Sequence, residues 1–441
     1  MKSINKIILL LFLAPYGITA GQNSSPDSLT LHQILDEVMA GYPSLLKANQ
    51  DLVAADARTG LTKTAYLPDI NFSGSYSRVG PTTSITMPIN GSNHTFSLFP
   101  ENVYSAGISI NENIYDFGKT AKNLTLDQKN KEMVQITIEQ VKQRLTSAVI
   151  ASYYSICFLQ EAIKIKDEQL KTFDEHLQFI QKKAATGSAT QYDIMSTKVR
   201  ISSIDNQKTD LLSGLGIQTG LLNSYLGKSL NNKLLLKQIN TGIEIIPDPE
   251  TLYAKALSTR PEMKIALQKS EIAKSRLDVV KTQNNPSFNF LASGGFKNGY
   301  LDQYLQDVGK LNFAVGVGFK MPVFDANRTK YIKIQTNSEI ESCQHETELT
   351  KRNICSEVLE CRTNAEAALK KVKQSELQLL QAEQAYNLAE VSYRAGSITN
   401  LDLMDSYTAL SESKLMLFKT KIDYAVNLQK LKIATGEKLY E

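Results

Sequence analysis

Two carboxylates stand three residues apart in the segment RAGSITNLDLMD, which covers residues 394–405. If a helix begins within this segment, Asp402 and Asp405 share one face of it. Carboxylates grouped in this way favour cations, and their effect depends on pH and salt. Asp402 also has a simpler interpretation, because Thr399 and Asp402 have the spacing of a capping box at a helix N-terminus. Asp405 lies one turn deeper, where capping explains it less well.

Other chemistry is weakly indicated. Cys343 and His345 are two residues apart, so they point in different directions on a helix, and no CxxC motif is present. Small buried or free thiols are therefore expected in place of a metal centre, for all of Cys157, Cys343, Cys355 and Cys361. No nucleophile with a neighbouring base and no Gly-rich phosphate-binding loop is recognisable. None of the four histidines belongs to a recognisable catalytic group. The sequence predicts neither an enzyme nor a bound cofactor.

The acidic segment has a counterpart 209 positions earlier, ATGSATQYDIMS at 185–196. Gly187 and Gly396 are suited to the left-handed conformation that ends a helix. Thr190 and Asp193 repeat the capping-box spacing, so a new helix is expected directly after each glycine. Both segments are therefore predicted to be tips of antiparallel helical hairpins.

Long helices are expected on both sides of the tips. Proline is absent between Pro100 and Pro247 and after Pro322, as in uninterrupted helices. Before each tip, apolar or aromatic residues recur every seven positions, as in a coiled coil. They are Ile163, Leu170, Leu177 and Ala184 in one half, and Val372, Leu379, Tyr386 and Tyr393 in the other.

The duplication extends over most of the chain. Residues 42–72 match 260–290 at an offset of 218, and IYDFGKT at 114–120 matches VFDANRT at 323–329 at an offset of 209. The segment containing Pro81, Pro88 and Gly91 lies between these blocks and is expected to be a variable surface loop that absorbs the difference. The predicted units are a first repeat at 21–228, a linker at 229–259, a second repeat at 260–436 and a tail at 437–441. The first repeat has a β-hairpin at 69–114 and a helical hairpin at 118–227 with its tip at 186–190. The second has a β-hairpin at 287–324 and a helical hairpin at 326–436 with its tip at 395–399.

The predicted strands alternate in polarity. In LNFAVGVGFKMPVF, every second residue from Leu311 to Val323 is apolar, and the residues between are small or polar up to Lys320. Residues 69–78, 104–114 and 287–296 alternate similarly. Such segments of about ten residues are typical of a lipid-facing β-barrel wall. Four strands cannot close a barrel with a channel, so several copies must share one; packing of the apolar faces on a helix layer in a soluble protein is the alternative.

The N-terminus has the pattern of a secretory leader. Lys2 and Lys6 precede the apolar run 7–13, and cleavage is expected near Ala20, giving a signal peptide at 1–20. No cysteine follows that site to carry a lipid anchor, and no later apolar run is long enough for a transmembrane helix. Loss of the two lysines lowers the formal net charge from +4 to +2, which gives no basis for nucleic-acid binding.

Taken in order and at nearly constant offset, these motifs resemble the TolC-type outer-membrane efflux channels over essentially the whole mature chain. The resemblance implies an α+β membrane protein, a homotrimer whose 12-stranded β-barrel receives four strands from each chain. Long helical hairpins continue it as an α-helical barrel through the periplasm. The resemblance further implies that the protein is a passive exit duct in the outer membrane, in contact with the membrane lipid. A periplasmic adaptor protein and an inner-membrane pump would deliver its cargo. Drugs, metals and proteins all remain possible cargo.

The resemblance also implies roles for residues at the tips. Gly187, Ser188, Ala189, Gly396, Ser397 and Ile398 would dock the adaptor. Asp402 and Asp405 would form a selectivity ring at the periplasmic entrance, six carboxylates in a trimer. Asp193 and Tyr393 would hold the gate shut, although packing explains Tyr393 equally well. Well-known relatives have an arginine where this chain has Ile398, so a gate ion pair made there is absent. An exported helical scaffold or adhesin without a pore is the alternative function.

Overall fold

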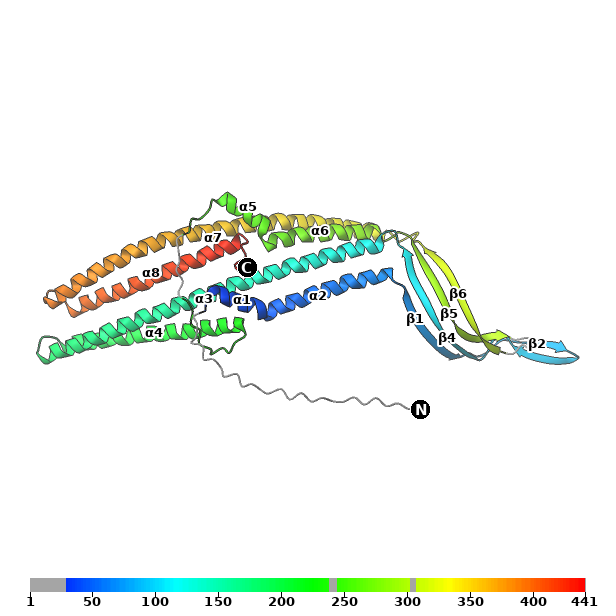
Figure 1. The fold of residues 1–441 in the computed structure, drawn as a ribbon, viewed down its shortest axis with the longest axis horizontal. Coiled ribbons are helices and arrows are strands. Elements are labelled where there is room, and N and C mark those ends of the chain that lie inside the picture. The colour runs from blue at the N-terminus through cyan, green and yellow to red at the C-terminus, as the bar shows by residue number, and fades with distance from the viewer. Residues whose placement is uncertain (1–28, 238–243, 302–306, 441) are drawn as a thin grey trace, which may run out of the picture.

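The computed structural model describes residues 29–237, 244–301 and 307–440. The predicted signal peptide lies outside these ranges. The protein is strongly elongated, with a β-sheet at one end and two helical hairpin tips at the other (Figure 1). The long helices connect the two ends, so the sheet and the tips are far apart in space.

The sheet has four strands in the order β1-β4-β5-β6, all antiparallel to their neighbours. They are β1 (Asp69–Arg78), β4 (Asn102–Tyr115), β5 (Ser287–Leu301) and β6 (Asp307–Lys320). The pairing of β4 with β5 joins the two repeats into one sheet. Strands β1 and β6 each have one unpaired edge in the single chain.

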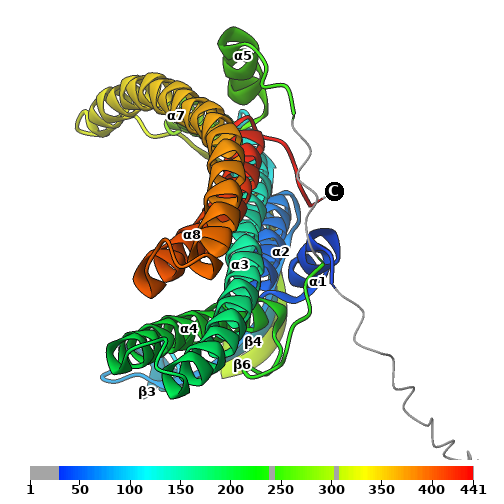
Figure 2. The same ribbon diagram turned by 90° about the vertical axis from the view of Figure 1, so that its left-hand side faces the viewer.

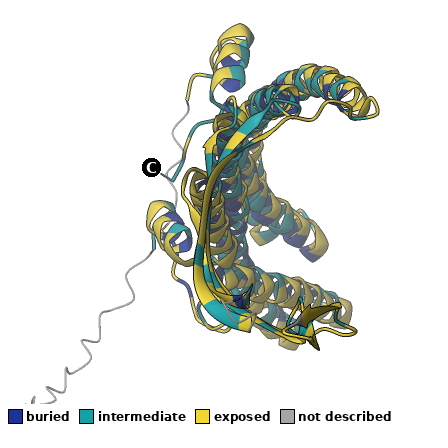
Figure 3. Ribbon diagram, turned by 90° about the vertical axis from the view of Figure 1, so that its right-hand side faces the viewer, coloured by how far each residue is buried: buried dark blue, intermediate teal, exposed yellow. Residues whose placement is uncertain are grey.

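The strand register places the predicted apolar residues on one face of the sheet. Ile110 pairs with Ile70 on one side and Ala292 on the other, and Ala292 pairs with Val315. This face is open to the surroundings: Phe313 is 86% exposed and Val315 is 68% exposed. Figure 3 shows the exposed character of the strands. The opposite face is lined by small and polar side chains such as Ser73, Ser109 and Ser293. The alternation seen in the sequence is confirmed.

An aspartate connects sheet to helix in each repeat. Asp116 accepts hydrogen bonds from the backbone N–H groups of Gly118 at 3.1 Å and Thr120 at 2.7 Å. Asp325 likewise accepts from the backbone N–H of Thr329 at 3.1 Å. These bonds satisfy donors that a helix leaves free at its N-terminus. The repeated motifs at 114–120 and 323–329 are therefore the junctions from which the long helices start.

The long helices have matching lengths in the two repeats. Helices α3 (Lys119–Ala185) and α7 (Arg328–Arg394) each have 67 residues, which is about 100 Å at 1.5 Å per residue. Helices α4 (Gln191–Leu226) and α8 (Asn400–Ala434) return antiparallel to them. Gly187 and Gly396 both have φ of 77°, and both predicted capping boxes are present. Each long helix and the helix that returns along it form an antiparallel hairpin, with its turn at Gly187 or Gly396.

Shorter helices complete a curved layer. They are α1 (Leu31–Gly41), α2 (Pro43–Lys63), α5 (Pro249–Thr259) and α6 (Pro261–Lys281), with a short 3-10 turn at Thr64–Tyr66. Near the sheet the order is α2-α3-α6-α7, the same order as the strands they adjoin. The largest buried cluster joins α1 to α3 through Val38, Val149 and Tyr153. Helices α1 and α5 and the C-terminus lie on the convex side of the layer (Figure 2).

Two sequence-based expectations need correction. The segment containing Pro81, Pro88 and Gly91 was expected to be a loop, but β2 (Ser84–Ile89) and β3 (Ser92–Ser97) form a hairpin there. Asn90 and Gly91 have φ of 52° and 80°, the turn geometry that an Asn-Gly pair favours. Also, helix α3 contains an apolar stretch of 18 residues, half of which is buried. It is apolar enough by length and composition to cross a membrane, and core packing gives a helix the same character.

Candidate functional site at the hairpin tips

The two tips have the same shape because they end and restart their helices in the same way. At the first tip, Gly187 and Ser188 are exposed and Ala189 is half-buried; at the second, Gly396, Ser397 and Ile398 repeat this pattern. Small exposed residues leave the backbone of each tip accessible. The residues expected to dock an adaptor therefore lie together at one end of the molecule (Figure 1).

Asp402 is the capping acid of α8. Its Oδ2 accepts hydrogen bonds from the backbone N–H of Thr399 at 2.9 Å and from the Thr399 hydroxyl at 2.7 Å. These bonds lower the pKa of Asp402 below its ordinary value, the hydroxyl contributing most. Asp402 is exposed, so its charge faces solvent while one oxygen caps the helix. Capping and a role in a charged ring are compatible in this geometry.

Asp405 is paired with a residue that the sequence analysis missed. Its Oδ1 lies 2.7 Å from Nη1 of Arg200 on α4, so the ion pair connects the two hairpins. The Asp405 side chain is 59% exposed and that of Arg200 is 27% exposed. A gate ion pair at position 398 was expected to be absent, because this chain has Ile398 there. Arg200 supplies a cation to the second hairpin from a different helix.

Tyr393 lies in an aromatic cluster with residues of α3. Its ring centroid is 5.5 Å from that of His176 and 6.4 Å from that of Phe179. The Lys183 ammonium lies 4.7 Å from the Tyr393 ring, a cation–π distance. Burial raises the pKa of Tyr393, and the Asp193 carboxylate raises it further. Tyr393 therefore connects α7 to the first hairpin by packing.

Asp193 does not make the direct bond to Tyr393 that a shared gating role suggests. Within the described residues, its side chain bonds only to Thr190, as the capping acid of α4 at 2.7 and 2.9 Å. Asp193 and Tyr393 are close enough for electrostatic interaction. The structure thus brings the two predicted gate residues near each other without joining them.

A buried polar contact also joins the hairpins. His176 Nε2 on α3 donates to Asn400 Oδ1 at the start of α8, at 2.6 Å. Asn400, which is 6% exposed, donates in turn to Thr197 of α4 at 3.4 Å. Burial lowers the pKa of His176, and the nearby Lys183 ammonium lowers it further, against the effect of the Asn400 bond. We call His176, Thr197 and Arg200 of the first hairpin, with Asn400 and Asp405 of the second, the tip latch.

The rest of the described chain offers little else for chemistry. No three His, Cys, Asp or Glu side chains converge as metal ligands in residues 29–237, 244–301 and 307–440. The four cysteines are free, and Cys157 is buried, which raises its pKa to about 12. The concentration of charged and polar contacts between hairpins makes the tips the candidate functional site.

Comparison with known proteins agrees with this architecture. Outer membrane protein TolC of Escherichia coli (strain K12) is 18% identical over 99% of this chain and 87% of its own length. The alkaline protease secretion protein AprF of Pseudomonas aeruginosa is 20% identical over 76% of this chain and 69% of its own. The structure of the Campylobacter jejuni CmeC outer membrane channel superimposes with a TM-score of 0.77 at 16% identity, covering 92% of this chain and 85% of that one. The outer membrane efflux protein model matches residues 34–227 and 252–437. The chain therefore belongs to the outer membrane efflux protein family.

Proposed function

We propose that three copies of this chain join edge to edge into one passive duct through the outer membrane and into the periplasm. The observation that carries the proposal is the four-stranded sheet, with one continuous exposed apolar face and two unpaired edges, β1 and β6. Unpaired backbone groups in hydrocarbon cost several kcal/mol each, so β6 of one copy has to pair with β1 of the next. Such closure gives a 12-stranded barrel.

The free edges of the helical layer support the same closure. Near the tips, α4 exposes Tyr192, Met195 and Val199, which are 72%, 60% and 68% exposed. Helix α7 exposes Leu388 and Val391, at 70% and 68%. Helices α4 and α7 belong to different hairpins, and their exposed apolar residues would cover each other between neighbouring copies. Burial of such side chains favours association by roughly 25 cal/mol per Å².

The oligomeric state of the purified full chain tests this proposal. Native mass spectrometry from detergent micelles is expected to show a complex of three chains that dissociates on heating. A water-soluble single chain with no affinity for lipid bilayers would rule the duct out and favour a scaffold without a pore.

Energy for transport would come from an inner-membrane pump, delivered through a periplasmic adaptor docked on the tips. The exposed small residues support this docking surface, since they allow close approach of another backbone. A photo-reactive amino acid at Ser188 or Ser397 is expected to cross-link a periplasmic protein in cells, because both positions are exposed. The same amino acid at Ser213, exposed on α4 away from the tip, serves as control. Equal cross-linking from all three positions would argue against docking at the tips.

The carboxylates at the tips would favour cations. In a trimer, Asp402 and Asp405 provide six carboxylates around the entrance, with each Asp405 partly neutralised by Arg200. The double variant Asp402→Asn, Asp405→Asn is expected to lose most of the cation preference and most of the block by trivalent cations, measured as reversal potential and current in planar bilayers. Asp193→Asn makes the same change in the capping box of the first tip and should leave the preference intact. An unchanged reversal potential in the double variant would exclude the ring.

The tip latch would hold the entrance closed at neutral pH. Folding into the latch lowers the pKa of His176 from its ordinary value of 6.5. The contribution of neutral His176 to the stability of the tip latch is therefore fully present above about pH 6.5. It is lost as the pH falls through the lowered pKa of His176. Bilayer currents are expected to show more opening at pH 5 than at pH 7.5, and His176→Gln should flatten this response. His345→Gln, an exposed histidine on α7, is the control, and a pH response that His176→Gln leaves unchanged would assign it elsewhere.

A further inference from the structure

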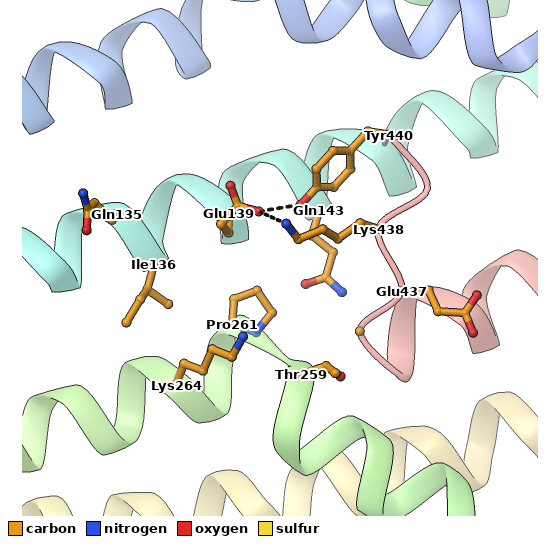
Figure 4. A pocket seen from close by; sticks show the side chains of 11 residues that line it. Gln135, Ile136, Glu139, Gln143, Thr259, Pro261, Lys264, Glu437, Lys438 and Tyr440 are labelled. Atoms are coloured by element: carbon orange, nitrogen blue, oxygen red, sulfur yellow. Dashed lines mark hydrogen bonds and ion pairs between the residues drawn. The ribbon is translucent and has the colours of Figure 1, made fainter.

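A cavity of about 220 Å³ lies near the middle of the protein, far from the tips. Its walls come from α3, from the start of α6 and from the C-terminal segment that follows α8 (Figure 4). Helices α3 and α6 are inner members of the layer, with α2 and α7 outside them. Joining of copies along α2 and α7 would therefore leave this cavity uncovered.

The floor of the cavity contains a buried acceptor without a partner. Gln143 is 7% exposed, and its Nε2 donates to the backbone carbonyl of Ile433 at 2.7 Å. Because a carbonyl oxygen only accepts, this bond fixes the orientation of the amide and directs Oε1 away from Ile433. Oε1 has no hydrogen-bond partner in the described protein. Figure 4 shows the Gln143 side chain extending from α3 into the cavity. A ligand that fits must bring a hydrogen-bond donor.

The charged side chains at the mouth of the cavity differ in whether they already have an ion-pair partner. Glu139 already accepts from Tyr440 at 2.9 Å and from Lys142 at 2.9 Å, and pairs with Lys438 at 3.4 Å. Lys264 makes no ion pair within the described residues. It lies beside Pro261 on the wall opposite Glu139 (Figure 4). Glu437 also lines the cavity and is paired with Lys255 at 2.5 Å. Both carboxylates and Lys438 are therefore already paired, which leaves Lys264 for an anionic group.

We propose that this cavity binds an N-acylated amino acid, the group that also forms the carboxyl end of every peptide. Its amide N–H is the donor that Gln143 Oε1 lacks, and the adjacent carboxylate pairs with Lys264. Its side chain packs against Ile136, Pro261 and the ring of Tyr440, which give the cavity its apolar surface. The bound molecule would connect the C-terminal segment to α3 and α6. The proposal does not depend on the duct.

Isothermal titration calorimetry on the purified full-length chain tests this site with N-acetyl-leucine as the probe. Saturable binding of one molecule per chain is expected. The methyl ester lacks the carboxylate, and the α-acetoxy analogue has an ester oxygen in place of the N–H. Each should bind at least tenfold more weakly. Tighter binding of glycyl-glycyl-leucine would identify a peptide end as the source, and equal or weaker binding would identify a free acylated amino acid.

Lys264→Gln provides the matched variant, because Lys264 is half-buried at the cavity mouth and its replacement is expected to leave the fold intact. It should weaken N-acetyl-leucine binding at least tenfold and leave the weaker binding of the methyl ester unchanged. Lys269→Gln, on the same helix but paired with Glu346 at 2.5 Å, should change neither. Equal affinity for N-acetyl-leucine, its methyl ester and the α-acetoxy analogue would overturn the proposal, and so would the absence of saturable heat. Gln143 Oε1 would then bind only water.

Discussion

Val315→Arg is expected to remove most of the assembled protein from the outer membrane. Val315 lies in the middle of β6, on the exposed apolar face of the sheet, and pairs with Ala292 of β5. An arginine on the lipid face of a barrel costs about 2–4 kcal/mol near the bilayer midplane. In the proposed trimer, three copies multiply this cost to about 6–12 kcal/mol. The measurement is the amount of heat-modifiable trimer in the outer-membrane fraction.

The neighbouring position provides the control for this prediction. Ala314 points to the opposite, small and polar face, where it lines a hollow with Ser109 and Ser293. Ala314→Arg places the same charge one residue away, on the face that would border the water-filled interior. We expect the trimer to assemble with this substitution. Equal loss of both variants would show that the strand tolerates no arginine, and equal assembly of both would place the apolar face away from lipid.

Arg200→Ala is expected to increase the open fraction of the duct by tenfold to a hundredfold. A partly exposed ion pair contributes about 0.5–1 kcal/mol, and each chain of the proposed trimer has one. Together they shift the equilibrium by about 1.5–3 kcal/mol, where 1.4 kcal/mol corresponds to a factor of ten. The fraction of time in the conducting state, measured in planar bilayers, gives the effect.

A charge exchange separates this ion pair from a general effect of losing arginine. The double variant Arg200→Asp, Asp405→Arg restores the pair in reverse and should return the open fraction toward its original value. Arg394→Ala removes a pair with Glu390 that lies within α7 alone, so it should not open the duct. If Arg200→Ala and Arg394→Ala have the same effect, the contact between hairpins does not hold the entrance closed.

The elements of this fold could be predicted where a local pattern determines them. The apolar face of β6 follows from alternation at 311–323, and the tips follow from Gly187 and Gly396 with a capping box behind each. Each pattern spans only a few residues. Strands β2 and β3 were missed, because Pro81, Pro88 and Gly91 indicated a loop, although an Asn-Gly pair at 90–91 is a hairpin signal.

The contacts of the candidate site were less accessible to sequence reasoning. Arg200 and Asp405 are 205 positions apart, and His176 and Asn400 are 224 apart. Their meeting depends on the angle and register at which one hairpin packs on the other, which no short motif encodes. One polar residue was visible in the sequence, since Asn400 lies between the capping residues Thr399 and Asp402. The structure shows that it is buried. A buried asparagine needs a polar partner from another element.

Single-channel recording in planar bilayers is the most direct test of the central claim that copies of this chain enclose a continuous duct. The account predicts discrete steps of current from the purified full-length protein, with a preference for cations that is mostly lost in the Asp402→Asn, Asp405→Asn variant. Trimers that insert stably into the bilayer but carry no ionic current, at neutral pH or at pH 5 and with or without Arg200, would contradict it.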